Sequence, residues 1–109
     1  MTSKEKIRNL DLSNAILKLK NRNEALMFLR DLLTESELIE FGNRFKAAQM
    51  LKEEIPYSKI EKETSLSSAT VARVSKWLKK GKGGYKLILD RLAKENHHHI
   101  STSFKRGLC

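Results

Sequence analysis

Apolar residues recur at helical spacing in two segments near the start of the chain. Residues 11–20 carry apolar side chains three or four positions apart, at Leu12, Ala15, Ile16 and Leu19, and this spacing predicts a helix. Residues 23–33, NEALMFLRDLL, are apolar on most faces of a helix. So broad an apolar surface is typical of a helix buried among others or at a subunit interface. Together the two segments predict a helical amino-terminal half that dimerises.

A third, longer helix is predicted after Thr34. The sequence TESE from Thr34 to Glu37 fits a capping box, in which the hydroxyl accepts from the backbone of the glutamate and the carboxylate reaches back. Apolar residues continue at helical spacing through residue 51. Pro56 restricts Ile55 before it, so the helix is expected to end just ahead of the proline.

The next 23 residues predict two short helices and a tight turn. A second capping-box pattern, SKIE, begins at Ser58 and predicts a helix over residues 58–64. Ser67 or Ser68 suits the N-cap of the following helix, which extends from about residue 69 to 80, with Gly81 as its C-cap. Two short helices with a three-residue turn have the dimensions of a helix-turn-helix, here over about residues 58–80.

The residue types within this segment predict both a core and a DNA-binding face. A shared core is expected at Ile60, Leu66, Val71 and Val74, with Thr64 beside them. On the exposed face, small residues let a helix approach the floor of the major groove, hydroxyls bond base edges, and basic side chains meet phosphates. The predicted DNA-binding residues are Ser58, Lys59, Ser67, Ser68, Ala69, Thr70, Arg73, Lys76, Lys79 and Lys80. The alternative for these residues is a helical hairpin with a solvated basic face.

The end of the chain predicts one more helix and a tail. Leu87, Ile88 and Leu92 are expected to face inward from a helix over residues 85–95. Residues 96–109 show no periodicity and are predicted to form a flexible basic tail, so that residues 1–95 make up the domain. The run His97–His99 is read as adventitious rather than as a metal site, because no carboxylate or thiol stands at ligand spacing from it.

The charge of the chain is concentrated in its last third. Residues 76–109 hold nine Lys or Arg against two Asp or Glu, whereas residues 1–75 hold 13 against 11. A localised basic field attracts polyanions, and nucleic acid is the leading candidate, with a solubilising tail as the alternative. The chain has one cysteine, Cys109, and no apolar run of the roughly 18 residues needed to cross a membrane. A single cysteine can form no internal disulfide, which fits a reducing cytoplasm, and we expect the protein there. No catalytic motif is present, so we do not expect an enzyme.

These residues also carry a family resemblance. The patterns LTxxE at 33–37, RxxxAxxL at 44–51 and SSATVARV at 67–74 resemble the Trp-repressor superfamily, and within it the Trp-repressor-like YerC/YecD-type family. The likeness covers roughly residues 25–93. It implies an all-α, multi-helix domain that forms an intertwined homodimer, each subunit presenting one helix-turn-helix to half of a palindromic operator. Such a dimer sets its two recognition helices about 34 Å apart, one turn of DNA.

The same resemblance bears on a small-molecule ligand. Arg44 and Arg73 occupy the positions of the two arginines that hold the tryptophan corepressor in the repressor. A glycine next to the indole is replaced by Val74, and a serine near the amino group of the ligand is replaced by Trp77. We therefore expect the protein's own side chains to fill this place and no cofactor to bind, with tryptophan or another small corepressor at Arg44 and Arg73 as the alternative. Glu61 stands where the repressor has a lysine, so the operator need not be a tryptophan operator.

The sequence as a whole predicts a regulator of bacterial transcription. The expected function is sequence-specific binding of double-stranded DNA by a homodimer that acts as a repressor, in the cytoplasm and at the nucleoid. Two alternatives remain open. One is a non-specific architectural protein that binds nucleic acid through its basic carboxy-terminal third. The other is a protein-interaction module with a degenerate helix-turn-helix.

Overall fold

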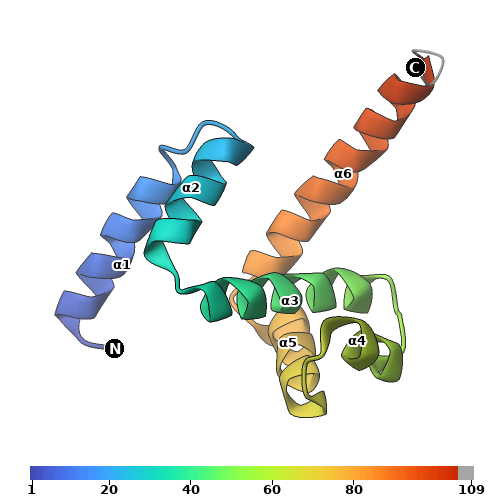
Figure 1. Ribbon diagram of the computed structural model, residues 1–109, viewed down its shortest axis with the longest axis horizontal. Helices are drawn as coiled ribbons and strands as arrows, with labels where there is room; N and C mark the ends of the chain where they lie inside the picture. The colour runs from blue at the N-terminus through green and yellow to red at the C-terminus, as the bar shows by residue number, and fades with distance from the viewer. Residues whose placement is uncertain (106–109) are drawn as a thin grey trace. The chain divides into compact units, whose positions relative to one another are not determined.

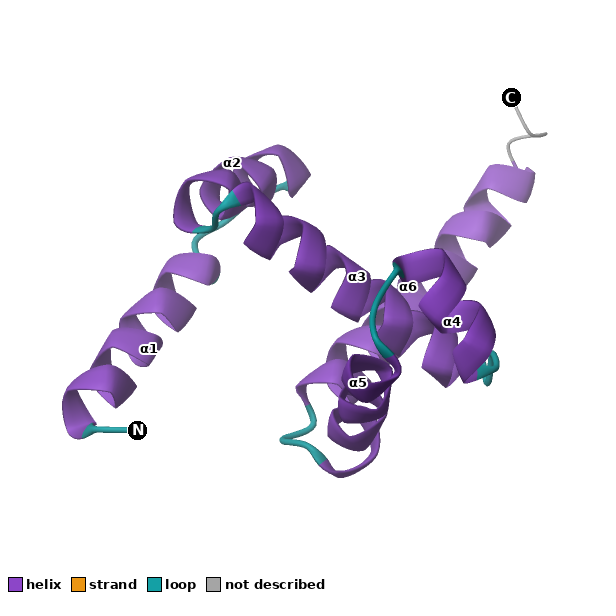
Figure 2. Ribbon diagram, turned by 60° about the horizontal axis from the view of Figure 1, so that its bottom comes forward, coloured by secondary structure: helices purple, strands orange, loops and turns teal. Residues whose placement is uncertain are grey.

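The protein is helical throughout the part of the chain that its structure describes. In the computed structural model the backbone is described for residues 1–105 and the side chains for residues 1–95. These residues form helices joined by short loops, without a strand (Figures 1 and 2). The helices are α1 (Ser3–Ile16), α2 (Arg22–Leu32), α3 (Glu35–Lys52), α4 (Tyr57–Thr64), α5 (Ser68–Lys80) and α6 (Gly84–Lys105). This confirms the all-α prediction. The chain divides into a first unit, Met1–Glu40, and a second unit, Phe41–Cys109.

The first helix lies earlier in the chain than its apolar spacing predicted. α1 ends at Ile16, so Leu19 lies beyond it. Its start is fixed by an N-cap at Thr2, which the apolar spacing did not indicate. The Thr2 hydroxyl accepts from the backbone N–H of Glu5 at 3.1 Å and donates to the Glu5 carboxylate at 3.0 Å. The pattern TSKE at residues 2–5 was the available signal.

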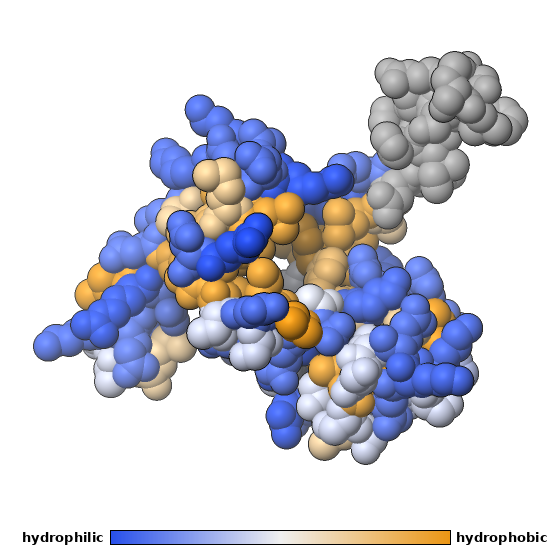
Figure 3. Space-filling view, viewed as in Figure 1, coloured by the Kyte–Doolittle hydropathy of each residue, from blue (hydrophilic) through white to orange (hydrophobic). Residues whose placement is uncertain are grey.

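The two amino-terminal helices keep their apolar side chains at the surface of this chain. α2 begins after Asn21, whose side chain accepts from the Glu24 backbone N–H at 2.9 Å. Neither α1 nor α2 has a buried residue. Apolar areas are visible at the surface over both helices (Figure 3). The exposed large apolar residues of the first unit are Met1, Ile7, Leu10, Ile16, Leu17, Leu26, Met27, Leu32 and Ile39.

The capping box at the start of α3 is present as predicted. The Glu37 backbone N–H donates to the Thr34 hydroxyl at 3.2 Å, and the Thr34 backbone N–H donates to the Glu37 carboxylate at 2.9 Å. The hydrogen bonds from Thr34, first from its backbone and then from its side chain, hold the pKa of Glu37 below its ordinary value of 4.5. Thr34 and Glu37 thus satisfy each other's backbone donors, which are left open at a helix start.

The core lies in the second unit, where α3, α4, α5 and α6 each contribute. Its buried apolar residues are Ala47, Ala48, Met50, Ile60, Val71, Val74 and Leu89. The predicted core residues Ile60, Val71 and Val74 are therefore confirmed, and Leu66 packs against them. Thr64 is buried beside them as expected.

The face of α6 that packs inward differs from the one predicted. Leu87 and Ile88 are exposed, whereas Leu89 is buried and Leu92 is half-buried. Tyr85 also packs against the core, and residues 85, 89 and 92 follow the spacing of one helical face. Because residues 87–89 are all apolar, the sequence allowed more than one face of this helix to point inward. The face adopted is the one that also contains Tyr85.

α6 also extends further than predicted. It continues through Lys105, so the boundary placed after residue 95 falls inside a helix. Residues 106–109 of the predicted tail, and the side chains of His97–His99, lie outside the described residues. Where it leaves the core, α6 is tied to α3 by an ion pair between Lys52 Nζ and Asp90 Oδ1 at 2.5 Å. The hydrogen bond from Lys52 lowers the pKa of Asp90, and the charges of Lys52, Lys86 and Lys94 add to this shift.

Candidate nucleic-acid interface

The first helix of the helix-turn-helix begins one residue before its predicted start. α4 starts at Tyr57, with Pro56 in the N-cap position and no side-chain hydrogen bond there. The capping box predicted from Ser58 is therefore wrong, because Ser58 already lies in the first turn. Proline serves here because its φ of −59° is already that of a helix start. Its carbonyl accepts from the backbone N–H groups of Lys59 and Ile60, both at 3.1 Å.

The turn between α4 and α5 has the predicted three residues, 65–67. It is held by Thr64, whose hydroxyl donates to the Ile60 carbonyl at 2.7 Å and accepts from the Leu66 backbone N–H at 3.3 Å. Ser65 lies in the left-handed region with φ of 60°, the position at which glycine is usual in this motif. A non-glycine residue pays a steric cost in that region, so tertiary packing holds Ser65 there.

Both ends of α5 are formed by the residues predicted for them. At the start, the Ser67 hydroxyl accepts from the Thr70 backbone N–H at 3.2 Å and lies 3.0 Å from the Thr70 hydroxyl. At the end, the Gly81 N–H donates to the Trp77 carbonyl at 2.9 Å. Gly81 has φ of −80°, which any residue adopts, but a Cβ atom here would collide with the Trp77 carbonyl. Glycine is therefore needed at this C-cap, because the backbone of residue 81 lies close to the Trp77 carbonyl.

The predicted DNA-binding residues lie mostly at the surface of this motif. α5 buries Val71, Val74 and Ser75 and turns its other side to solvent. Thr70 is half-buried, with its hydroxyl against Ser67. All the other predicted contacts are exposed: Ser58, Lys59, Ser67, Ser68, Ala69, Arg73, Lys76, Lys79 and Lys80. Ala72 shares this exposed side of α5.

The charged residues of α5 and of the loop after it are all basic. Residues 64–89 contain six basic residues and no acidic one. The basic residues are Arg73, Lys76, Lys79, Lys80, Lys82 and Lys86. A cluster of positive charge of this kind raises the local concentration of polyanions and speeds their association.

Arg44 lies between two aromatic rings. Its guanidinium carbon is 5.5 Å from the centroid of the Phe41 ring and 6.0 Å from that of the Trp77 ring, within the range of cation–π contacts. The family resemblance placed Arg44 and Trp77 at the same corepressor position, but it did not indicate Phe41. The available signal was the spacing of three residues between Phe41 and Arg44, which puts them on one face of a helix. The other predicted ligand residue, Arg73, is exposed on α5.

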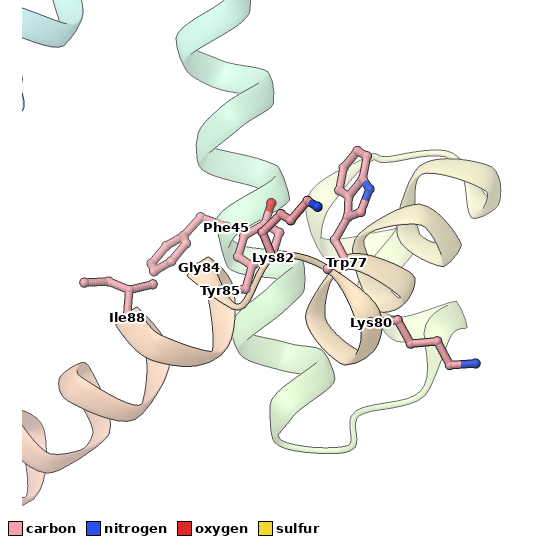
Figure 4. Close-up of a pocket in the computed structure, with 8 residues that line it drawn as sticks. Phe45, Trp77, Lys80, Lys82, Gly84, Tyr85 and Ile88 are labelled. Carbon is pink, nitrogen blue, oxygen red and sulfur yellow. The ribbon is translucent and has the colours of Figure 1, made fainter. Parts of the chain in front are cut away.

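A hollow of about 660 Å³ lies beside Trp77. Phe45 of α3, Trp77 of α5, and Tyr85 and Ile88 of α6 surround it (Figure 4). Lys82 lies at this hollow, whereas the Lys80 side chain points away from it (Figure 4). Its walls are mainly aromatic and aliphatic, and they bear no carboxylate.

Within the described residues, no group of three or more His, Cys, Asp or Glu side chains lies close enough together to hold a metal ion. None of the helices in this part of the chain combines the length and apolar character required to cross a membrane.

The fold and this surface define the class of protein: a small helical domain that carries a helix-turn-helix with a basic outer face. Residues 9–93 match the model of the Trp repressor protein family. The chain belongs to the Trp repressor family, which is a family of DNA-binding regulators, not of enzymes.

Three relatives illustrate the similarity. Uncharacterized protein YerC of Bacillus subtilis (strain 168) is 40% identical over 91 residues, which cover 81% of this chain and 88% of that protein. A TrpR-like protein from Eubacterium eligens, known from its crystal structure, is 38% identical in sequence to this chain. The TM-score of the two structures is 0.73, and the match covers 76% of this chain and 86% of that one. A candidate Trp repressor from Staphylococcus aureus, also known from its crystal structure, is 38% identical in sequence. The TM-score is 0.74, and the match covers 85% of this chain and 96% of that one.

Proposed function

We propose that this protein is a sequence-specific regulator of transcription that binds a palindromic operator as a homodimer and acts as a repressor. The observation that carries the proposal is the exposed side of α5, where small residues near the helix start are followed by basic residues on a closed helix-turn-helix core. A helix of this shape enters the major groove with its amino-terminal residues at the base edges. The proposed place of action is the cytoplasm, at the nucleoid.

The exposed residues divide into two roles. Arg73, Lys76, Lys79 and Lys80 supply most of the affinity by neutralising phosphates, and Ser58 and Lys59 meet the backbone from α4. Ser68 and Ala69 face the bases, where a hydroxyl bonds base edges and a methyl group contacts thymine. The hydroxyls of Ser67 and Thr70 already interact with each other at the helix cap, so their contribution to base recognition is the smaller one.

The apolar surfaces of the chain support the homodimer. A chain of 109 residues buries a modest core, and small domains often complete theirs by association. Leu26 and Met27 of α2, and Leu87 and Ile88 of α6, are exposed in the single chain. We propose that a second copy of the chain covers these apolar residues, because a dimer can place one helix-turn-helix against each half of a palindrome.

The proposed function does not require free tryptophan as a corepressor. Trp77 lies against Arg44, one of the two arginines that the family resemblance assigns to the corepressor. The indole of the protein itself therefore occupies the surroundings of that arginine, and Arg73 is exposed and available to phosphate.

The deciding experiment is selection of bound duplexes from a random library at about physiological salt, with and without tryptophan. The expected result is a palindrome with half-sites one DNA turn apart, recovered equally under both conditions. Binding without a recovered sequence would support the architectural alternative, and indifference to DNA even at low salt would support the protein-interaction module. A tryptophan-dependent sequence would contradict the absence of a corepressor.

The phosphate role is tested by Lys79→Ala. This change should weaken binding to the selected site and to random duplex alike and should reduce the salt slope by about 1, because one phosphate contact is lost. Binding is measured by fluorescence anisotropy over a series of salt concentrations, with Lys18→Ala in the first unit as the matched control. A loss confined to the selected site would show that Lys79 reads bases instead.

A further inference from the structure

α5 is joined to α3 by two different kinds of contact. Val74 is buried in the core with Ala47 and Ala48 of α3, which are small apolar residues. One turn further along α5, Trp77 meets Arg44 of α3, whose guanidinium also lies over Phe41. The apolar contact fixes how closely the two helices approach, and the aromatic contact adds a second point of attachment.

The second contact has directional character that the first lacks. Contacts among methyl groups are nearly independent of orientation, so the packing of Val74 does not by itself define the rotation of α5 about its axis. A guanidinium is planar and stacks on aromatic faces with a defined geometry. Arg44 is half-buried and its Nε atom is buried, so the group is held within the protein and is not a loose surface side chain.

Rotation of α5 would move the residues that face DNA. Arg73 precedes Trp77 by one helical turn and Lys76 is its immediate neighbour in the chain. Any turn of the helix that separates Trp77 from Arg44 therefore redirects both basic side chains. Trp77 and Phe41 are 39% and 43% exposed, so this cluster contributes less to the core than the buried residues do.

We propose that the Phe41–Arg44–Trp77 cluster is a positioning element that sets the direction in which α5 presents Arg73 and Lys76 to DNA. This inference rests on the proposed function. Arg44 and Trp77 act through the orientation of α5, without touching DNA, and they are needed for specific binding more than for binding in general.

The test is a double-mutant cycle in the full chain. Arg44→Gln and Trp77→Leu should each lower affinity for the selected operator by about two- to thirtyfold, the range that corresponds to loss of one cation–π contact. Affinity for random duplex should change by less than a factor of two. The double variant should bind no more weakly than the weaker single variant, because the Arg44–Trp77 contact is already lost in each of them. Trp77→Phe, which keeps a ring, should restore most of the affinity.

Two further measurements separate positioning from other roles. Lys46→Gln removes an exposed charge from the same helix and should leave the specificity ratio unchanged. Trp77 is the chain's single tryptophan, so fluorescence reports the cluster directly. Arg44→Gln should shift the emission in the absence of DNA, and Lys46→Gln should not. Sedimentation confirms that each variant keeps the assembly state of the native protein.

The outcomes decide between distinct explanations. Additive losses, or equal losses on random duplex, would show independent DNA contacts and would overturn the positioning role. Loss of binding that disappears at higher protein concentration would assign the residues to self-association and would also overturn it. If the native protein bound no duplex, the proposed function would fail on its own. Amide exchange of α5 would then decide the inference: faster exchange in both variants supports it, and unchanged exchange overturns it.

Discussion

The helix-turn-helix and the two amino-terminal helices differ in where their apolar side chains go. In the second unit, Ile60, Val71 and Val74 are fully buried against each other and against α3. In the first unit, α1 and α2 have no buried residue at all. The helix-turn-helix therefore contains its own core, whereas the amino-terminal helices have apolar faces that only another surface can cover.

Local signals do not account for this difference. Thr2, Asn21 and Ser67 each cap the start of a helix through a side-chain hydrogen bond. Side-chain caps therefore occur in both regions, although α4 has none. What separates them is tertiary burial, which supplies most of the stability of a helix in a protein. From this comparison we predict that the helix-turn-helix is stable within one chain and that the amino-terminal helices gain stability from a second surface.

The largest expected effect is on the core of the helix-turn-helix. Ile60→Ala should lower the free energy of unfolding by about 2–5 kcal/mol, because it removes buried methyl groups and leaves a cavity. Urea denaturation followed by circular dichroism measures the change. The matched substitution Ile7→Ala, at a side chain that is 58% exposed, should cost much less in dilute protein.

Protein concentration sharpens this first comparison. If the first unit is covered by a second copy, the cost of Ile7→Ala should increase as protein concentration rises, and the cost of Ile60→Ala should not. Equal costs at all concentrations would show that α1 is buried within the single chain, contrary to the difference described above.

The second prediction concerns the surface of α2. Leu26 is 49% exposed, and Leu26→Glu should raise the dissociation constant of the proposed homodimer by about tenfold or more, since an apolar interface excludes an unpaired charge. Analytical ultracentrifugation measures the constant. Helical content of the second unit should persist. The control is Asn23→Glu, a polar exposed position on the same helix, which should leave the constant nearly unchanged.

The sequence predicted best those features that depend on neighbouring residues. The capping box at Thr34, the cap at Ser67 and the three-residue turn all follow from local hydrogen-bond chemistry. The core of the helix-turn-helix was also predicted, because Ile60, Val71 and Val74 lie on the single apolar face of each short helix. When a helix has only one apolar face, the sequence alone shows which side chains point into the core.

Features that depend on distant partners were not predictable in this way. Three consecutive apolar residues in α6 fit either of two faces, and only the packing of Tyr85 selects Leu89. Lys52 and Asp90 are 38 positions apart, and nothing in the spacing of charges pairs them. For the candidate interface, residue types identified the exposed side of α5 but not the Phe41–Arg44–Trp77 cluster that supports it.

The third prediction concerns the caps and carries a pH dependence. Thr34→Ala should lower stability by about 1 kcal/mol, the usual cost of losing an N-cap. Because Thr34 lowers the pKa of Glu37, the native contact stabilises the fold above pH 4.5 and is lost as the pH falls through the pKa of the folded state. The variant should therefore show a weaker loss of stability on acidification, and NMR titration should show the pKa of Glu37 returning toward its ordinary value.

The equivalent change at the start of α1 tests the difference between a helix without buried residues and α3, which contributes to the core. Thr2→Ala removes a similar cap from α1, a helix without buried residues. It should increase amide exchange locally in α1 while leaving the urea midpoint of the second unit in place. A shift of that midpoint as large as the one from Thr34→Ala would show that α1 and the core unfold as one cooperative unit.

The smallest expected effect is a gain in stability at the turn of the helix-turn-helix. Ser65 has φ of 60°, and Ser65→Gly should raise the free energy of unfolding by roughly 0.5–1 kcal/mol, because relief of the left-handed strain exceeds the added entropy of the unfolded glycine. Ser65→Ala, which keeps a Cβ atom, should change little. The urea midpoint measures both.

A second position with the same backbone conformation shows whether the gain belongs to the turn. Glu54, after α3, also has φ of 60°, so Glu54→Gly should bring a similar gain, and the two gains should add because the sites share no hydrogen bond. Thr64 would still hold the turn through Ile60 and Leu66, so DNA affinity should stay within a factor of two in Ser65→Gly. A loss of affinity with a gain in stability would mean that the strained turn sets the angle between α4 and α5, and that the core alone does not fix it.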